Sequence, residues 1–476
     1  MHTTPVPVVA DQAPGRTPPA HGSAASSRTR GSGYFSERPE VKHSEYAPEG
    51  QPAPDAPGPR ASAGGRQLPR WGQVRELLQF RAPEVDPVRR RLAGALTIAD
   101  LRRIATRTTP RAVFDYVDGS ADAEVTAGRN RAAFADVTFV PELLHAVADP
   151  DLSTVVLGTR VTMPLIFAPT GYTRMMHHAG EVAVARVAQR SGLPYTLSTV
   201  GTSTVEEVHD AAPQGENWFQ LYLTNNEALN HELVDRALAA GFTTVVLTID
   251  TAVGGRRLKD VRNGLTIPPS LTVRTFLDMS RFPYWWVNKL TTPPIEFASV
   301  RGFPGTSADV AALLFDPGLE YEDLVWLRKK WPHKLLVKGV LSPLDAQRVV
   351  ALGADGVVVS NHGGRQLDRT PATLDVLPAV REAVGSDATV LLDSGVTHGQ
   401  DIIAAVALGA DAVMVGRAYL YGLMAGGERG VERAVQILRA EYQRGLQLLG
   451  LDGTSRIERR HVRVPSDSGC QHDITP

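Results

Sequence analysis

The chain has 476 residues, of which 43% are hydrophobic and 21% are charged, so it can form a large single-core fold with additional segments. Its formal net charge is −1, which gives no reason to expect nucleic-acid binding through global charge. The single cysteine, Cys470, excludes a disulfide framework within the chain and fits a reducing compartment.

Membrane, export and metal signals are weak in this sequence. No apolar run reaches the roughly 18–20 residues of a spanning helix, and the N-terminus lacks the apolar core of a secretory signal. We therefore expect a cytoplasmic protein. No His/Cys cluster has metal-ligand spacing, and the adjacent His177 and His178 are expected in a solvated loop, so no metal site is predicted.

The N-terminal region has the composition of a tail. Residues 1–65 are rich in Pro, Gly, Ala, Ser and scattered charge, as in "APEGQPAPDAPGPRASAGG". They hold too few large apolar side chains to offset the entropy cost of ordering, which predicts disorder. The folded domain is expected at 66–465, followed by a flexible C-terminus at 466–476. It opens with two short amphipathic helical segments, "WGQVRELLQF" and "TIADLRRIATRTTPRAVFDYVDG", and Thr97 is the expected N-cap of the second.

From Pro164 onward, short apolar strands alternate with helices. The predicted strands are "PLIFAPTG", "YTLSTV", "NWFQLYL", "TTVVLTID", "KLLVKGV", "GVVVSNHG", "TVLLDSG" and "AVMVGRA". Continuous apolar strands separated by helices indicate a parallel sheet covered on its outer face. About eight such units in roughly 250 residues predict an α/β fold of the (β/α)8 TIM-barrel type. The repeat "ALGADGVVVS" and "ALGADAVMVG" supports this prediction. An open doubly wound sheet is the alternative, disfavoured by the number of units.

One connection is far longer than the roughly 2–6 residues of an ordinary βα loop. Residues 251–318, after the fourth strand, form a predicted insertion that contains "DMSRFPYWWVNKLTTPPIEF". There Tyr284, Trp285 and Trp286 lie together between cationic residues. Two interpretations stay open: a loop over the barrel mouth or subunit contact with a small aromatic core, or a surface that rests on the membrane interface.

The strand ends carry an unusual set of polar residues and glycines. Reading only those ends gives Thr170, Gly171, Ser198, Gln220, Tyr222, Thr248, Asp250, Lys338, Asn361, His362, Arg365, Asp393, Gly395, Gly416 and Arg417. Each residue alone more often has a structural role. Ordinary turns need Gly, Asn, Asp or Ser, whereas Lys, His, Arg and Tyr converging from separate strands predict a functional rim at the C-terminal end of the barrel.

The residue types on this rim suggest two anion sites and a base. Fixed positive charge comes from Lys338, Arg257, Arg365 and Arg417. "DSG" and "GRA" end the seventh and eighth strands, where barrels commonly bind a phosphate through backbone N–H groups and an Arg. The remaining cations predict a second anion, a carboxylate held by the forked guanidinium of Arg. A neutral His362 beside it can act as general base, oriented by Asp250.

The motifs "SNHGGRQLD", "APTG", "FQLY", "LTID", "LVKG", "LLDSG" and "GRAYLYGL" resemble, in order and spacing, the FMN-dependent α-hydroxy-acid dehydrogenases and oxidases. The resemblance runs from about Leu96 to His461 and is strongest to bacterial quinone-linked L-lactate dehydrogenases. It implies bound FMN, a small (S)-2-hydroxy acid such as L-lactate as substrate, and a quinone as electron acceptor. It further implies a homotetramer and peripheral contact with the inner face of the cell membrane.

Three alternatives remain beside that reading. The first is an oxidase that uses O2 and releases H2O2, acting on glycolate, lactate or a mandelate-type substrate. The others are a flavin-binding regulatory protein without turnover and a barrel with a polar rim and no flavin. FMN is preferred over FAD because no G-x-G-x-x-G fingerprint opens a strand–turn–helix unit.

The resemblance also implies roles for individual residues. His362 would take the substrate proton with Asp250 as its partner, while Lys338 would lie near the flavin N1 edge. The substrate carboxylate would be bound by Tyr116, Arg257 and Arg365, with Tyr222 contacting the substrate and stabilising its developing charge. The cofactor would be held by Thr170, Gly171, Ser198, Gln220, Thr248, Lys338, Asp393, Gly395, Gly416 and Arg417.

Three positions depart from the family pattern. Thr397, in "SGVTHG", replaces an Arg that often assists the phosphate, so phosphate binding should depend more on Arg417. Val200 stands where glycolate oxidase has a Trp that narrows the pocket. Gly171 stands where oxidases often carry Ala, which hints at a dehydrogenase with a roomier pocket.

Overall fold

The computed structural model describes residues 71–72, 75, 84–264, 278, 280–300 and 317–465. The tail expected at 1–65, most of "WGQVRELLQF" and the C-terminus expected at 466–476 lie outside the described residues. Contacts divide the chain into two units, Met1–Arg81 and Ala82–Pro476, and the fold below is that of the second unit.

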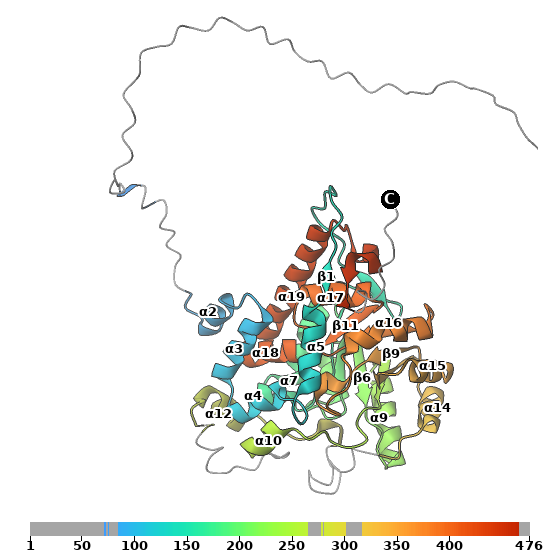
Figure 1. Ribbon diagram of the computed structural model, residues 1–476. Coiled ribbons are helices and arrows are strands. Elements are labelled where there is room, and N and C mark those ends of the chain that lie inside the picture. The colour runs from blue at the N-terminus through green and yellow to red at the C-terminus, as the bar shows by residue number, and fades with distance from the viewer. Residues whose placement is uncertain are drawn as a thin grey trace, which may run out of the picture. The chain divides into compact units, whose positions relative to one another are not determined.

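A closed barrel of eight parallel strands forms the centre of this unit (Figure 1). The strands are β4 (Leu165–Phe167), β5 (Tyr195–Ser198), β6 (Asn217–Leu221), β7 (Thr244–Thr248), β8 (Lys334–Val340), β9 (Gly356–Val359), β10 (Thr389–Leu392) and β11 (Ala412–Val415). Neighbours in chain order pair in parallel, and β11 pairs with β4 to close the barrel. The (β/α)8 prediction is confirmed, as are the eight strands, and the open sheet is excluded.

The strands are apolar on both faces because each contributes to two cores. Side chains that include Ile166, Trp218, Leu336 and Met414 fill the barrel interior. The alternate residues of the same strands pack outward against the helices in one continuous cluster. This double burial explains why the strands appear in the sequence as uninterrupted apolar runs.

Helices surround the barrel in the order that the sequence predicts. They are α7 (Gly180–Ser191), α8 (Val205–Ala211), α9 (Glu227–Ala239), α14 (Tyr321–Lys330), α15 (Pro343–Ala351), α16 (Thr373–Val384), α17 (Gly399–Ala407) and α19 (Glu428–Leu449). One further helix, α18 (Arg417–Gly426), was not predicted. The expected strand "AVMVGRA" stops at Val415, and Arg417 already begins α18, which packs against α19.

The segment before the barrel forms several short helices. They are α2 (Pro87–Ala93), α3 (Ile98–Thr108), α4 (Arg111–Asp118) and α5 (Val125–Ala135). Thr97 caps α3 in a reciprocal capping box with Asp100, as predicted. The segment expected to be one helix is two, because Pro110 has no N–H to continue α3 and instead precedes α4. Short strands pair as β1 (Thr138–Phe139) with β12 (Val462–Arg463) and β2 (Thr154–Val156) with β3 (Thr159–Val161).

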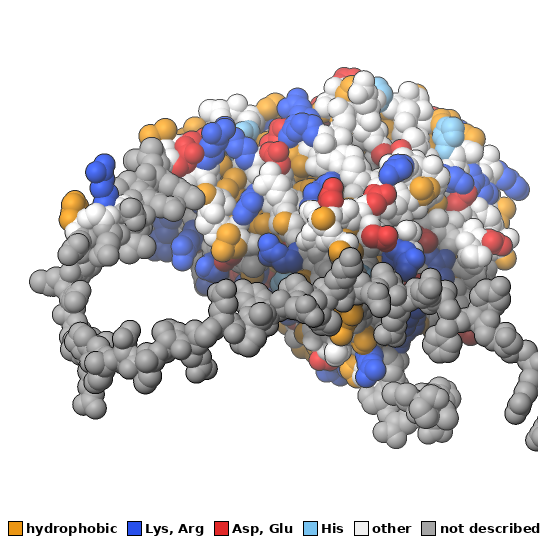
Figure 2. Space-filling view, turned by 90° about the horizontal axis from the view of Figure 1, so that it is seen from above, with side chains coloured by type: hydrophobic (Ala, Val, Ile, Leu, Met, Phe, Trp, Pro, Cys, Tyr) orange, Lys and Arg blue, Asp and Glu red, His pale blue; other side chains and the backbone are white. Residues whose placement is uncertain are grey.

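The insertion after β7 contributes helices at one end of the barrel. Its described part includes α10 (Leu258–Asn263), α12 (Pro283–Leu290) and the 3-10 turn η1 (Ala298–Val300). Figure 1 shows α10 and α12 at the end of the molecule opposite to β1. Across the described ranges, no helix is both long and apolar enough to cross a membrane. Seen from above in Figure 2, the opposite face mixes acidic and basic side chains with scattered apolar ones.

The prediction for the two adjacent histidines is right about the loop and wrong about its exposure to solvent. His177 and His178 follow α6 (Thr173–Met176) and are half-buried, with their rings stacked at 4.3 Å between centroids. Burial, with the nearby His178 and Arg91, lowers the pKa of His177 to about 4. The turn packs against neighbouring elements, which residue spacing alone could not reveal.

Candidate active site

A cavity of about 1010 Å³ opens at the C-terminal ends of the barrel strands. The predicted rim residues that line it are Tyr116, Thr170, Gly171, Ser198, Gln220, Tyr222, Thr248, Arg257, Lys338, His362, Arg365, Asp393, Gly395, Gly416 and Arg417. Asp250 and Asn361 are the exceptions. Asp250 is hydrogen-bonded to His362 without lining the cavity, and Asn361 is buried against Asn130. The barrel thus brings together residues separated by some 300 positions in the sequence.

His362 and Asp250 form a hydrogen-bonded pair. Nδ1 of His362 lies 2.9 Å from Oδ1 of Asp250. The left-handed backbone of His362 (φ 57°) and Gly363 (φ 67°) turns the chain sharply after β9, in the 3-10 turn η2 (His362–Gly364). Since the carboxylate engages Nδ1, Nε2 is the ring atom available for proton transfer.

The charge of Asp250 is stabilised by its surroundings. Burial opposes ionisation, but the positive charges of His362 and Lys338 hold the pKa of Asp250 below its ordinary value. Its second oxygen, Oδ2, is buried and has no hydrogen-bond partner among the described residues. An ionised carboxylate in this position can fix the imidazole orientation and stabilise an imidazolium.

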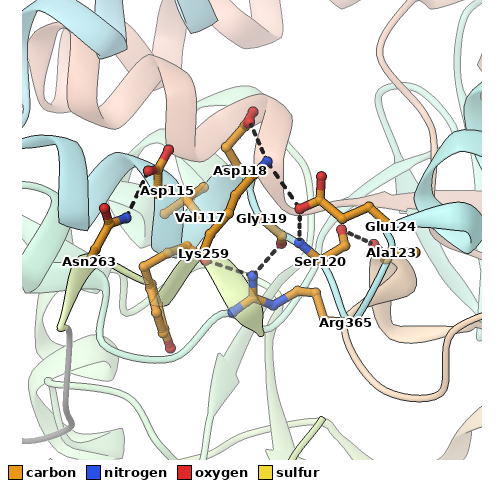
Figure 3. Close-up of polar contacts among 12 residues, drawn as sticks. Asp115, Val117, Asp118, Gly119, Ser120, Ala123, Glu124, Lys259, Asn263 and Arg365 are labelled. Atoms are coloured by element: carbon orange, nitrogen blue, oxygen red, sulfur yellow. Dashed lines mark hydrogen bonds and ion pairs between the residues drawn. The ribbon is translucent and has the colours of Figure 1, made fainter. Parts of the chain in front are cut away.

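Two arginines and two tyrosines form the polar wall beside this pair. Arg365 donates from Nη1 to the backbone oxygens of Tyr116 (2.6 Å) and Gly119 (2.9 Å), as Figure 3 shows for Gly119. Its guanidinium lies 5.1 Å from the Tyr116 ring centroid, and that of Arg257 lies 5.8 Å from it. Burial, together with the charge of Arg257, lowers the pKa of Arg365 to about 10. Tyr222 is kept protonated, since burial and the charge of Asp250 raise its pKa.

Arg257 and Arg365 have one carboxylate partner between them among the described residues. Arg257 pairs with Asp260 through Nε at 2.9 Å, whereas Arg365 has no ion-pair partner among the described residues. A half-buried guanidinium without a carboxylate partner favours the binding of an anion. The wall can therefore bind a small carboxylate beside His362.

Lys338 is less free than the sequence implied. It is almost fully buried, and its Nζ donates to Ser360 Oγ at 2.9 Å and lies 3.2 Å from Asp393 Oδ2. Burial opposes its charge, but Asp393 and Asp250 raise the pKa of Lys338 above its ordinary value. The lysine remains cationic at the floor of the cavity.

Two buried polar atoms at strand ends test whether FMN fits here. Gln220 Nε2 and Thr248 Oγ1 are buried without a hydrogen-bond partner among the described residues. Ser198 Oγ donates to the other end of the Gln220 amide at 3.0 Å, which fixes its orientation. Partnerless donors next to a buried lysine suit the polar edge of an isoalloxazine ring, so the residues present fit FMN.

The loops after β10 and β11 can bind a phosphate and let a ligand approach the backbone closely. Gly416 precedes the N-terminus of α18, and Gly395 has a φ of +103°, which strongly favours glycine. Arg417 is held at the end of α4. Its Nε donates a hydrogen bond to Val117 O at 3.1 Å, and its Nη2 donates one to Ser120 Oγ at 2.7 Å. Thr397, which replaces the family's Arg, hydrogen-bonds to the adjacent His398 and to Asp401 in the first turn of α17.

The cavity lining at Thr170 and Gly171 contacts Tyr419 and Val200. Thr170 Oγ1 and Tyr419 OH are 2.6 Å apart. A Cβ at Gly171 would overlap Val200 Cγ2, so these two departures from the family pattern are in direct contact. Val200 therefore fills part of the space beside Gly171, so glycine at this position widens the pocket less than expected.

Several supporting residues were missed by the sequence analysis. They are Asn130, Ser360, Ser394 and Asp260. Ser360 accepts from His362 N, and Ser394 accepts from Gly363 N, so two hydroxyls hold the strained turn. The first stands in "SNHGG" and the second in "DSG", and strand-end position was the signal that could have identified them.

A charged cluster that was also missed attaches the insertion to the helical segment before the barrel. Lys259 Nζ lies 3.0 Å from Glu124 Oε1 and 3.8 Å from Asp118 Oδ2, and Asn263 donates to Asp115 Oδ2 at 2.7 Å (Figure 3). These contacts fix α10 on α4. Because Arg257 precedes α10, the cluster also sets where that guanidinium stands.

Comparisons with known proteins agree with this site. The family model for FMN-dependent dehydrogenases matches residues 105–464. The "Putative L-lactate dehydrogenase" of Mycobacterium tuberculosis is 48% identical over 83% of this chain and 96% of its own length. The L-lactate dehydrogenase of Pectobacterium atrosepticum is 40% identical over 74% of this chain and 92% of its own.

Solved structures give the same family. The monotopic membrane protein (S)-mandelate dehydrogenase is 38% identical, with a TM-score of 0.75, over 78% of this chain and all of that one. A mandelate oxidase is 32% identical, with a TM-score of 0.67, over 78% of this chain and 99% of that one. The chain therefore belongs to the FMN-dependent α-hydroxy-acid dehydrogenase family, and its cofactor is FMN.

Proposed function

We propose that this protein oxidises an (S)-2-hydroxy acid, first of all L-lactate to pyruvate, and passes the electrons to a quinone. The observation that carries the proposal is that His362, hydrogen-bonded to Asp250, lines the same cavity as Arg365, which has no ion-pair partner among the described residues. A base beside a carboxylate-binding cation suits a substrate whose alcohol and carboxylate share neighbouring carbons.

The proposed roles follow from these positions. Arg365 and Arg257 bind the substrate carboxylate, Tyr222 donates a hydrogen bond to the reacting end, and Nε2 of His362 takes a proton. Asp250 then stabilises the imidazolium. Bound FMN supplies the two-electron acceptor. The residues that would hold it are Thr170, Gly171, Ser198, Gln220, Thr248, Lys338, Asp393, Gly395, Gly416 and Arg417.

L-Lactate is proposed because two relatives bear that activity in their names, although two solved neighbours are named for mandelate. Relative kcat/KM for L-lactate, glycolate, (S)-mandelate and D-lactate with a soluble dye measures the choice. A kcat/KM for (S)-mandelate above that for L-lactate would overturn the lactate assignment and leave the reaction class intact.

The acceptor is the second question, since a mandelate oxidase is among the structural neighbours. We expect substrate-reduced enzyme to be reoxidised much faster by a quinone analogue than by O2. Rapid mixing of the reduced enzyme with each acceptor measures both rates. Faster reoxidation by O2, with H2O2 released, would make the protein an oxidase.

The outward face of α12 supports a peripheral membrane position on the inner face of the cell membrane. Tyr284, Val287 and Leu290 are 64%, 59% and 76% exposed. Trp285 does not belong to this face: it packs against the core, and its Nε1 donates to Met175 O at 3.0 Å. The proposed contact therefore rests on Tyr284, Val287 and Leu290 rather than on the three adjacent aromatics.

We further propose a homotetramer, as the family resemblance implied. Light scattering on purified holoenzyme gives the mass directly. A monomeric mass at working concentration would contradict this proposal without affecting the reaction.

A further inference from the structure

A second cavity, of about 670 Å³, lies beside the active-site cavity. It is enclosed by α2, the end of α3, the turn between α6 and α7, α12 and the turn between α18 and α19. Met176 lines both cavities, so they are neighbours. None of the residues given roles in the proposed reaction lines the second cavity.

The lining of this cavity carries an excess of positive charge. Its cations are Arg91, Arg107, Arg174, Arg281, Lys289 and Arg429, and its carboxylates are Asp86 and Glu428. Both carboxylates are already paired, Asp86 with Arg429 and Glu428 with Arg190 at 2.7 Å. Across the described ranges, the other five cations have no carboxylate within ion-pair distance.

Three of these cations, Arg91, Arg174 and Lys289, are half-buried, whereas Arg107, Arg281 and Arg429 are exposed. Nε of Arg91 is buried without a hydrogen-bond partner among the described residues. Burial and the nearby Arg174 lower the pKa of Lys289 to about 8. Arg174 itself donates to Pro293 O at 2.8 Å, which fixes its position. Like charges that are partly withdrawn from water are unfavourable unless an anion neutralises them.

The surrounding groups define the anion. Arg91, Arg174 and Lys289 come from three separate elements and face one space, which suits an anion with several oxygens in different directions. A carboxylate presents only two oxygens in one plane. The aromatic side chains of Tyr284 and Trp285 on the same wall suit an organic group attached to the anion.

We propose that this cavity binds a phosphate ester, held by Arg91, Arg174 and Lys289. The adjoining apolar face of α12 makes an acidic phospholipid headgroup one source of that ester, and a soluble metabolite is the other. Binding of the ester is independent of the proposed reaction. Only the lipid source rests on the proposed membrane contact of α12.

Calorimetric titration of the holoenzyme with sn-glycerol 3-phosphate tests the site. We expect saturable binding that the double variant Arg91→Gln/Lys289→Gln weakens at least tenfold. The matched control Arg103→Gln/Arg160→Gln removes two charges from exposed surface, where the side chains are 66% and 74% exposed, and should bind like wild type. Flavin content and melting temperature verify that each variant is folded.

Vesicle flotation distinguishes the two sources. If the ester is a headgroup, wild type binds vesicles that contain phosphatidylglycerol, the Arg91/Lys289 variant does not, and glycerol phosphate competes. If it is a soluble metabolite, the double variant still binds glycerol phosphate at least tenfold more weakly than wild type, but vesicle binding is equal in variant and wild type. Absence of saturable ester binding by wild type, or equal affinity in the double variant, overturns the proposal. Neither result depends on turnover of L-lactate.

Discussion

At the scale of single residues, the site depends on a turn that most side chains would avoid. His362 has a φ of 57° and is held by the hydroxyls of Ser360 and Ser394 around it. A non-glycine residue in the left-handed region is uncommon, and it persists where surrounding contacts over-determine it. Those contacts aim the imidazole into the cavity and against Asp250.

Replacing His362 with Gln tests the proposed base. We expect flavin to remain bound, because the side chain is not among the groups proposed to hold FMN, and its reduction by L-lactate to slow by about 10²–10⁴. Rapid mixing under anaerobic conditions measures the rate. Reduction at close to the wild-type rate would remove His362 from the role of base.

Arg365→Lys tests the carboxylate wall. A lysine keeps the charge but loses the fork and the bonds to Tyr116 and Gly119, so about 1.5–3 kcal/mol of substrate binding should be lost. This corresponds to a rise of roughly 10- to 150-fold in KM. If kcat fell with no change in KM, Arg365 would be acting on the transition state alone.

His177 gives a stability prediction with a defined sign. Its folded pKa of about 4 lies below the ordinary 6.5, so the unfolded chain takes up the proton first as pH falls. Its contribution to stability is complete above pH 6.5 and is lost as pH falls towards 4. As pH is lowered from 6.5 to 4, the melting temperature of the His177→Asn variant should therefore fall less than that of wild type. If the melting temperatures of the two proteins fell equally with pH, the lowered pKa of His177 would be contradicted.

At the scale of elements, α12 has one face that packs on the core and another that is exposed. Trp285 points inward to Met175, while Tyr284, Val287 and Leu290 are exposed. The sequence suggested a group of three equivalent aromatics, but helical geometry sends neighbouring residues to different faces. A test of membrane contact must therefore leave Trp285 in place.

The triple variant Tyr284→Ser/Val287→Ser/Leu290→Ser removes the apolar side chains of the outward face, while Arg91, Arg174 and Lys289 of the second cavity stay in place. We expect loss of binding to anionic liposomes and impaired quinone reduction, with L-lactate reduction of a soluble dye retained. The control triple Val155→Ser/Leu344→Ser/Leu448→Ser removes apolar groups that are 59%, 54% and 72% exposed elsewhere. Equal loss of dye and quinone activity in the α12 variant would identify a lid or subunit contact instead.

At the scale of the whole molecule, the described fold is complete without the first 65 residues. The barrel closes between β4 and β11, and its two cores are made within the described ranges after residue 84. The composition of residues 1–65 offers little apolar surface to add to them.

Removal of residues 1–65 is therefore expected to leave FMN content and turnover unchanged. The melting temperature should move by less than the roughly 2–4 °C that corresponds to about 1 kcal/mol in a domain of moderate size. Calorimetry and the flavin absorption of the shortened protein provide the measurement. Loss of flavin, or a much larger drop in melting temperature, would mean that the segment packs on the barrel.

The sequence by itself determined the barrel, because strand burial on both faces leaves an apolar run that is read directly from the chain. It also located most of the rim, since all parallel strands of a barrel end at one edge. Phe167, Leu197 and Val359 could each be assigned to a strand without knowledge of their partners.

Only the tertiary structure decided contacts between residues that are distant in the chain. It pairs Lys338 with Asp393, Lys259 with Glu124 and Arg417 with Ser120, and periodicity carries no information about such pairs. It also places the aromatic residues Tyr284 and Trp285 on different faces of α12, and it brings the cations of the second cavity together from separate elements. The physical reason is that local pattern fixes which face a side chain takes, whereas packing fixes what it meets there.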